Sequence, residues 1–329
     1  MKMGGKMKKI LSVLMLCLML LFSGCSKKET ADELTRVTTY LSELKSYSLT
    51  STMTIHRSDK NVSIRVGVDY LSPSYYKVSF TSQDNNEQLI IKNDNGVYVL
   101  TPSLNKQFKF DSDWPLNSSH AYLLEAICKD IKADQAASGT QENSNIKIEC
   151  AITHKTNQNA TKMQYLCKAD DLKPQKTLFL NDKGDPVIEV DFDSFTPNNS
   201  LSKDHFNEKK YLTEQEDSTG KDEETADIAV TAGYEIEGNQ LESSTTKDNV
   251  TILCYSGSKP YTIIVQEAQT YSEVIPLECY QSIDFLEGGL CFFNENTMKY
   301  FLGNYEIAIY SNSLTTEEYL DVAGAITLV

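Results

Sequence analysis

The sequence is poor in the motifs that mark an enzyme. It holds only four histidines in 329 residues, and none stands in the HExxH spacing of a zinc protease. No GxSxG nucleophile elbow occurs, and YSGSKP at residues 255–260 lacks the spacing of a phosphate-binding loop. The histidines are His56, His120, His154 and His205. Exposed or hydrogen-bonded roles explain them better than catalysis does, so we expect a protein that is not an enzyme and holds no metal or cofactor.

Basic residues and closely paired cysteines are also scarce. The 31 Lys and Arg residues face 46 Asp and Glu residues, for a net charge of −15, which argues against nucleic acid or anionic lipid as the main partner. No CxxC spacing occurs, so zinc sites and thioredoxin-like chemistry have no support. Beyond the N-terminal segment no apolar run reaches about 18 residues, and no other segment is predicted to span a membrane.

The N-terminus, by contrast, carries a strong pattern. Four lysines among the first nine residues precede an apolar run from Ile10 to Phe22, and the small residues Ser23 and Gly24 then precede Cys25. The run has the length of a secretory signal, about 7–15 residues, and is shorter than the roughly 20 residues that span a bilayer. This arrangement resembles the lipobox of bacterial lipoproteins, in which the cysteine thiol receives a diacylglycerol.

We therefore predict a signal peptide over residues 1–24 and lipidation of Cys25. The alternative is an ordinary signal peptide or a buried N-terminal helix with an incidental cysteine. Two acyl chains on one glycerol hold a protein firmly, whereas a single chain binds reversibly. The expected location is thus the extracytoplasmic face of the cell membrane, with the chain held there by its lipid anchor.

The remainder is predicted to form two strand-rich units. After a polar tether at residues 25–33, the apolar residues Leu34, Val37, Leu41 and Leu44 recur at helical spacing. Short segments of alternating apolar and polar residues follow, separated by turn sequences, which is typical of a meander of antiparallel strands.

Three further segments complete this domain plan. A second helix is predicted over residues 119–131, and the acid-rich residues 207–227 predict a solvated linker. The first domain then covers residues 34–206, and a second domain of mixed α and β structure covers residues 228–329. Its final helix begins with Thr315 and Glu318 in the spacing of a capping box.

A hairpin is predicted between residues 146 and 170. Closing its turn at residues 157–160 places Ile152 opposite Tyr165 and Cys150 opposite Cys167. Directly opposite residues can lie close enough to form a disulfide. The pattern leaves two interpretations open, a disulfide between Cys150 and Cys167 or two buried thiols on a core face.

One stretch supports a family resemblance. In LKPQKTLFLNDKGDPVIEVDFDSFTPN, residues 172–198, a turn carries Asp182 and Gly184, and the next strand ends with Phe192 and Phe195. Together with the order of helices and strands, this resembles the LolA/LolB lipoprotein-carrier superfamily over residues 34–206. The layout is also similar to GerS-like germination lipoproteins of Gram-positive spore formers. The tail resembles an uncharacterised C-terminal domain that is often joined to such modules.

The resemblance implies an α+β protein that binds rather than catalyses. The expected fold is an antiparallel half-barrel with helices across its concave face, followed by a smaller α+β domain. The leading hypothesis is a lipoprotein that binds a partner protein in the cell or spore envelope, in sporulation or germination. The alternative is a carrier or sensor of an acyl chain or a lipoprotein, held in the half-barrel cavity. The residues expected to line that cavity, which would equally fill an ordinary core, are Met53, Ile55, Val66, Val78 and Leu89.

Overall fold

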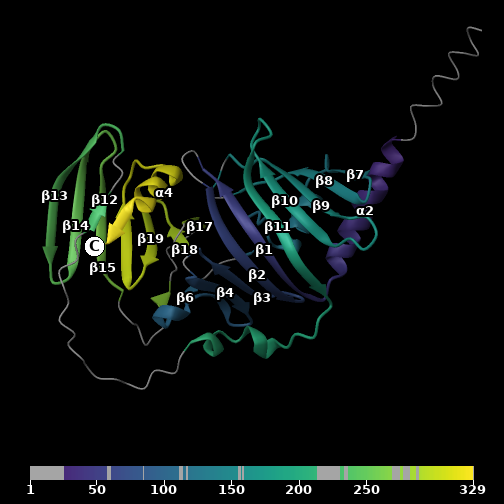
Figure 1. Cartoon of the computed structure of the whole chain (residues 1–329), viewed down its shortest axis with the longest axis horizontal. Coiled ribbons are helices and arrows are strands. Elements are labelled where there is room, and N and C mark those ends of the chain that lie inside the picture. The colour runs from purple at the N-terminus through teal and green to yellow at the C-terminus, as the bar shows by residue number, and fades with distance from the viewer. Residues whose placement is uncertain are drawn as a thin grey trace, which may run out of the picture.

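The computed structural model describes most of the chain after the predicted signal peptide. The described residues are 26–57, 61–83, 85–110, 114–115, 118–154, 157, 159–212, 230–232, 236–268, 275–276, 282–286 and 289–328. They form a mostly β structure with few helices, in two large antiparallel sheets and one small sheet (Figure 1). The expected α+β class is confirmed in part: the antiparallel sheets are present, but the few helices make the structure mostly β.

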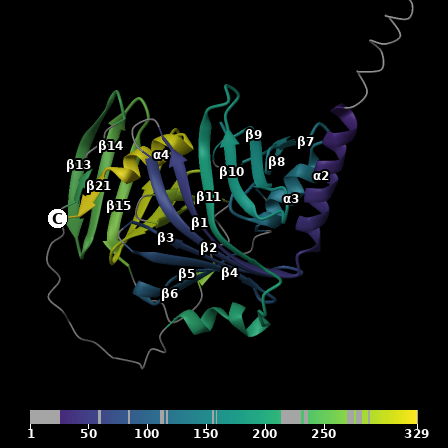
Figure 2. The same cartoon turned by 45° about the vertical axis from the view of Figure 1, so that its right-hand side comes forward.

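The first sheet has 12 strands in the order β16-β6-β5-β4-β3-β2-β1-β11-β10-β9-β8-β7 and curves strongly (Figure 2). Neighbours pair antiparallel except β16, which runs parallel to β6. Its strands are β1 (Ser46–His56), β2 (Asn61–Leu71), β3 (Tyr75–Thr81), β4 (Glu87–Asn93), β5 (Gly96–Thr101), β6 (Lys106–Phe110), β7 (Ser138–Glu142), β8 (Asn145–Ala151), β9 (Lys162–Lys168), β10 (Pro174–Leu180), β11 (Pro186–Pro197) and β16 (Ile275–Pro276). The predicted meander is confirmed in β1 to β6.

Two helices pack against one face of this sheet. Helix α2 (Ser26–Glu43) buries Val37 and Leu41, and α3 (Leu124–Ala133) buries Leu124 and Ile127 in the same core as the inward side chains of the strands. Both boundaries differ from the prediction. The residues assigned to a tether are helical from Ser26, and α3 begins five residues later than expected, after Leu123, with no side-chain cap.

The β8–β9 hairpin has the predicted faces but another register. Ile148 lies opposite Tyr165 and Cys150 lies opposite Met163, so Cys150 and Cys167 are not neighbours and both are free thiols. The predicted register was wrong because side-chain direction repeats every two residues, and an even slip keeps the same face apolar. The longer connection, closed by Ile152 N donating to Thr161 O at 3.0 Å, decides the register.

The turn between β10 and β11 has the geometry that its glycine suggests. Gly184 adopts φ +89°, which side chains rarely allow, and Asp182 accepts a hydrogen bond from the Thr161 hydroxyl at 2.7 Å. Phe192 is buried in the core, and the Phe195 ring lies 5.9 Å from that of Tyr47. The four residues that carry the family resemblance are thus structural in role.

The opposite face of the first sheet is covered by the segment that follows β11. The short helices η2 (Lys203–Phe206) and η3 (Glu208–Tyr211) place Phe206 in a second cluster with Tyr75 and Ile91. His205 Nε2 lies 2.7 Å from Asp69 Oδ2 and fixes this segment to β2. Residues 207–212, predicted as part of a solvated linker, therefore pack on the sheet; residues 213–227 lie outside the described residues.

The second large sheet has seven strands in the order β13-β14-β15-β20-β19-β18-β17. They are β13 (Asn239–Lys247), β14 (Val250–Gly257), β15 (Tyr261–Glu267), β17 (Ser282–Leu286), β18 (Gly289–Phe293), β19 (Thr297–Leu302) and β20 (Tyr305–Tyr310). Helix α4 (Thr316–Gly324) packs on one face, and β12 (Val230–Ala232) pairs with β21 (Ile326–Leu328).

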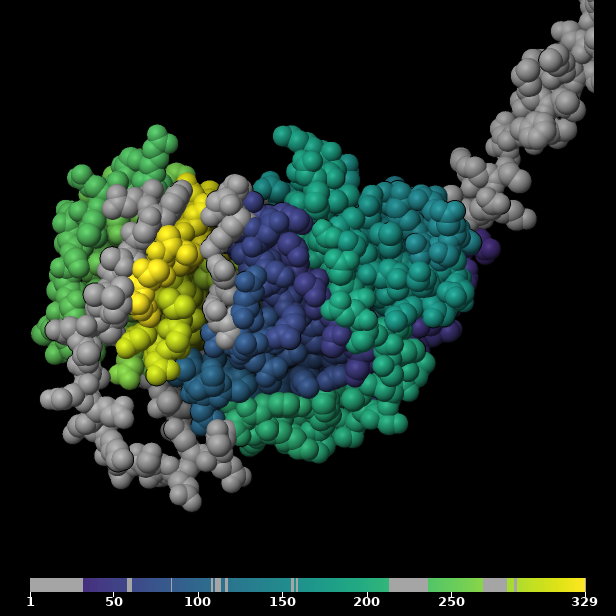
Figure 3. Space-filling model, in the orientation of Figure 1, coloured from purple at the N-terminus to yellow at the C-terminus, as the bar shows by residue number. Residues whose placement is uncertain are grey.

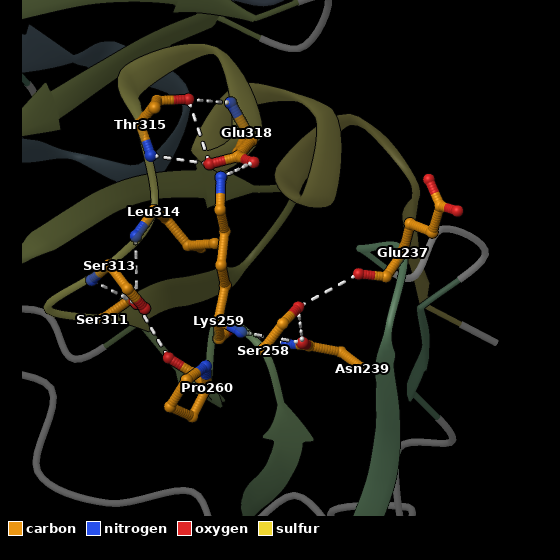
Figure 4. A network of polar contacts seen from close by, with 10 residues as sticks. All are labelled: Glu237, Asn239, Ser258, Lys259, Pro260, Ser311, Ser313, Leu314, Thr315 and Glu318. Carbon is orange, nitrogen blue, oxygen red and sulfur yellow. Dashed lines mark hydrogen bonds and ion pairs between the residues drawn. The ribbon is translucent and has the colours of Figure 1, made fainter.

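The start of α4 confirms the predicted capping box. Thr315 Oγ1 accepts from Glu318 N at 3.3 Å, and Glu318 Oε2 accepts from Thr315 N at 2.8 Å (Figure 4). Glu318 also forms an ion pair with Lys259, whose backbone N donates to Asn239 Oδ1 at 3.0 Å. This network ties the helix to the turn that follows β14.

Candidate functional site

Four of the five predicted cavity residues share one apolar face of the first sheet. Met53, Ile55, Val66 and Val78 are all buried in the core that also holds the apolar residues of α2 and α3. We call this the concave face. The sequence therefore identified the correct face of β1, β2 and β3.

Leu89 lies on the other face, and its assignment to the cavity was wrong. In the pairing of β3 with β4, Val78 stands opposite Ile90, while Leu89 stands opposite Ser79. Leu89 accordingly packs with Phe206 under the segment after β11. Both faces of β4 are apolar and buried, so alternation of residue types could not tell which side Leu89 would take.

The concave face is covered by a part of the chain that was assigned to the second domain. We call β17 and β18 together the wedge. The ring of Phe285 in the wedge lies 4.9 Å from that of Phe80 and 6.4 Å from that of Tyr122, which precedes α3. Leu290 and Phe292 of the wedge are 1% exposed and belong to the core of the first sheet. Figure 3 shows the yellow C-terminal part of the chain meeting the blue part of the first sheet at the lower end of the border between them.

Two side chains of the first unit hold backbone groups of the wedge. Arg57, directly after β1, donates from Nη2 to the carbonyl of Phe285, and Gln88 Oε1 accepts from Leu290 N. Gln88 is itself oriented by a hydrogen bond from its Nε2 to Thr101 Oγ1 at 3.2 Å. A Cβ at Gly289 would collide with the Gln88 side chain, so this close approach requires glycine. The wedge is therefore held in one position by polar contacts as well as by apolar packing.

Charges at the same boundary are complementary. Lys106 Nζ of β6 lies 5.3 Å from the centre of the Phe301 ring, which belongs to β19. Burial lowers the pKa of Lys106 to about 8, and the carboxylates of Glu306 and Glu267 oppose this shift. Burial likewise lowers the pKa of His154, while the charge of Asp284 in the wedge acts in the opposite direction. Basic groups of the first unit thus face acidic groups of the second.

The chain also connects the two units through a strand. Strand β16 lies between β15 and β17 in the chain but belongs to the first sheet. It pairs parallel with β6, with Ile275 beside Phe108. The first sheet is therefore completed at this edge by residues that follow β6 by more than half the length of the chain. The two predicted domains share contacts through β16, the wedge and Phe301.

In the part of the chain that the structure describes, no three His, Cys, Asp or Glu side chains converge as metal ligands would. Among the same residues, no helix has both the length and the apolar character required to cross a membrane. The predicted lipidation site, Cys25, lies outside the described residues.

Sequence reasoning missed the wedge. Its residues Leu290 to Phe293 form an uninterrupted apolar run, whereas a strand with one solvated face alternates. That run indicated burial on both faces. It did not indicate which other segment would provide the second cover.

Comparisons with known proteins identify relatives of most of the chain. A family model described as sporulation protein YdcC-like matches residues 6–206. Sporulation protein YdcC of Bacillus subtilis (strain 168) is 30% identical over 257 residues, which cover 76% of each chain.

Solved structures give weaker likenesses. The MucA/MucB complex of Pseudomonas aeruginosa matches with 14% identity and a TM-score of 0.34, covering 90% of this chain and 97% of that chain. The CwlD amidase of Clostridioides difficile in complex with the GerS lipoprotein matches with 15% identity and a TM-score of 0.32, covering 49% and 91%. A LolA superfamily protein of Nitrosomonas europaea matches with 12% identity and a TM-score of 0.32, covering 55% and 99%. These TM-scores are below the level at which a shared fold or function follows.

Proposed function

The chain belongs to the YdcC-like family of sporulation proteins, and from this we propose that it acts in sporulation as a lipid-anchored protein that binds a partner protein in the cell or spore envelope. The anchor rests on the N-terminal sequence pattern. In that arrangement Cys25 is the membrane attachment point, and α2, which begins at Ser26, is the first folded element above the membrane.

The observation that carries partner binding is the closure of the concave face by the wedge. Met53, Val66 and Val78 lie in a core that Leu290 and Phe292 of the same chain complete. An acyl chain would have to displace these side chains, whereas a protein partner can use the surface around the boundary or replace the wedge. Binding of a protein is therefore favoured over permanent carriage of a lipid.

A second candidate function keeps the acyl chain as ligand. It is favoured by the composition of the concave face, which is aliphatic and aromatic over β1 to β3. It requires that the wedge move away when the ligand enters. Native mass spectrometry of the mature protein distinguishes the two: a bound mass in the lipid range supports the carrier, and the mass of the protein alone supports the protein-binding role.

The anchor is tested with two cysteine variants in the organism that encodes the chain. Cys25→Ala should abolish incorporation of labelled palmitate, shift the protein out of the membrane fraction and lower the count of heat-resistant spores. Cys17→Ala is the matched control, because this cysteine lies inside the apolar run and should keep all three properties. Normal lipid labelling and normal spore counts with Cys25→Ala would contradict the proposal.

A further inference from the structure

The wedge packs on the first unit as a bound segment would. It contacts Phe80, Tyr122, Arg57 and Gln88, and we call these four residues the seat. Phe285 packs its ring against the rings of Phe80 and Tyr122, which themselves lie 5.4 Å apart at nearly right angles. Edge-to-face and tilted ring pairs of this kind stabilise a contact beyond the burial of area. The first unit therefore presents two aromatic rings to one side chain of the second unit.

The hydrogen bonds at this seat recognise backbone rather than side chains. Phe285 directs its carbonyl to Arg57 and its N–H to Asp284 Oδ1, at 2.7 Å, so both backbone groups are satisfied by side chains instead of by another strand. Leu290 in turn gives its N–H to Gln88. Because one donor and one acceptor of the first unit contact only main-chain atoms, and these atoms lie opposite each other on the two strands of the wedge, a different β-hairpin could make the same bonds.

The wedge can leave this seat without dismantling the second core. Phe285, Leu290 and Phe292 point to the concave face, whereas the intervening residues Leu286, Cys291 and Phe293 belong to the core beneath α4. The alternation of a two-faced hairpin therefore divides the wedge between two separate cores. If another apolar segment replaces the wedge on the concave face, the side chains on the other face of the wedge stay packed in the core beneath α4.

We propose that the seat formed by Phe80, Tyr122, Arg57 and Gln88 is the docking site for an aromatic β-hairpin with acidic flanks on a partner protein, and that the wedge occupies it as an internal competitor. The acidic flanks follow from charge. Arg57 donates to the carbonyl of Phe285, the residue directly after Asp284, and the charges of Glu306 and Glu267 act on Lys106, in a chain with a net charge of −15. This inference rests on the proposed function, since it names the chemistry of the partner that the envelope protein would bind.

The test uses the mature full-length chain and a labelled peptide of the sequence at residues 282–293, with Ser in place of the cysteine. Fluorescence anisotropy should show at least roughly tenfold tighter binding to Phe285→Ala than to the wild type, because the internal competitor is weakened. Arg57→Ala is a second variant that leaves the apolar cores intact and should lower peptide affinity at least severalfold when combined with Phe285→Ala. A peptide with Lys and Ala at the positions of Asp284 and Phe285 should not bind.

Phe206→Ala is the matched control, since it removes an equally large buried ring from the opposite face of the sheet. The inference is overturned if this control gains the same binding, or if folded Phe285→Ala binds the peptide no better than the wild type does. The peptide assay requires neither the lipid anchor nor a sporulating cell. Its failure is therefore distinct from a failure of the anchoring and spore-count experiment.

Discussion

The ring of Phe285 lies 4.9 Å from the ring of Phe80, and this contact joins the second sheet to the concave face of the first. Phe80 is buried in the core of the first sheet and the half-buried Phe285 packs against that core, so the contact lies where the second unit meets the first. The two sheets are consequently coupled in stability, although each has its own set of buried residues.

Removal of the Phe285 ring should uncouple the two units. Phe285→Ala is expected to lower the free energy of unfolding by about 2 kcal/mol, less than the 3–5 kcal/mol typical of a fully buried phenylalanine. In calorimetry the wild type is expected to unfold in one transition. Phe285→Ala is expected to unfold in two, with the second unit unfolding first. Leu241→Ala, at a side chain 44% exposed, should leave the transition unchanged. An unaltered transition in Phe285→Ala would show that the wedge does not couple the units.

The Asp69–His205 contact should hold the segment after β11 on the sheet. Burial alone would raise the pKa of Asp69, but hydrogen bonds from Ser48 and His205 and the charge of Lys77 hold it below its usual 3.8. Because the pKa is lower in the folded state, the stabilisation is present above about pH 4 and is lost as the pH falls through the folded pKa.

His205→Ala should therefore destabilise the protein by about 1–2 kcal/mol at pH 7. Hydrogen exchange should accelerate in residues 201–212 and remain slow in α4. The difference from the wild type should shrink below pH 4, where Asp69 becomes protonated. Unchanged exchange in residues 201–212 would mean that Phe206 alone holds the segment.

Ionisation of the buried Glu125 should lower the free energy of unfolding as the pH rises. Burial in the first turn of α3 raises its pKa to about 7, although Tyr47 donates a hydrogen bond to Oε2 at 2.7 Å. Between pH 4.5 and about 7 the folded chain binds more protons at this group than the unfolded chain, so stability is greatest below 4.5 and declines across this range. The change corresponds to about 3 kcal/mol, from 1.36 kcal/mol per pH unit.

Glu125→Gln is expected to be as stable as the wild type near pH 5 and more stable by about 1–3 kcal/mol at pH 8. Urea unfolding at several pH values measures this difference. Glu317→Gln, at an exposed position of α4, is the control and should follow the wild type at every pH. Parallel curves for Glu125→Gln and the wild type would contradict the assignment.

Cys150 and Cys167 should remain reduced and unreactive in the folded protein. Burial raises the pKa of both thiols to about 12, and their strand partners are Met163 and Ile146. Alkylation with iodoacetamide at pH 8, followed by mass spectrometry, should modify the half-buried Cys254 before Cys150 and Cys167. Reductant should leave the unfolding temperature unchanged. Detection of a disulfide-linked Cys150–Cys167 peptide would contradict this expectation and support the register predicted from the sequence.

Several elements could be predicted from the sequence because their causes are local. The apolar spacing of Leu34 to Leu44 makes a helix with one buried side, and the Thr315–Glu318 pair supplies the backbone bonds that begin α4. Alternation in β1 to β3 places Met53, Val66 and Val78 on one face. Each of these follows from residues that are a few positions apart in the chain.

The errors share a different cause. Alternation could not decide the side of Leu89, because both faces of β4 are covered, or the register of Cys150, because an even slip preserves the pattern. Both depend on which distant segment packs where. The start of α3 is likewise set by the burial of Leu124 and not by a capping side chain.

Composition and spacing alone predict the lipid anchor, the strand-rich class and the apolar character of the concave face, since they express these properties directly. The closure of this face by the chain's own wedge follows from tertiary packing. Phe285, Gln88 and Arg57 meet because two sheets with separate cores bury more apolar surface together than apart, and no local pattern encodes that choice.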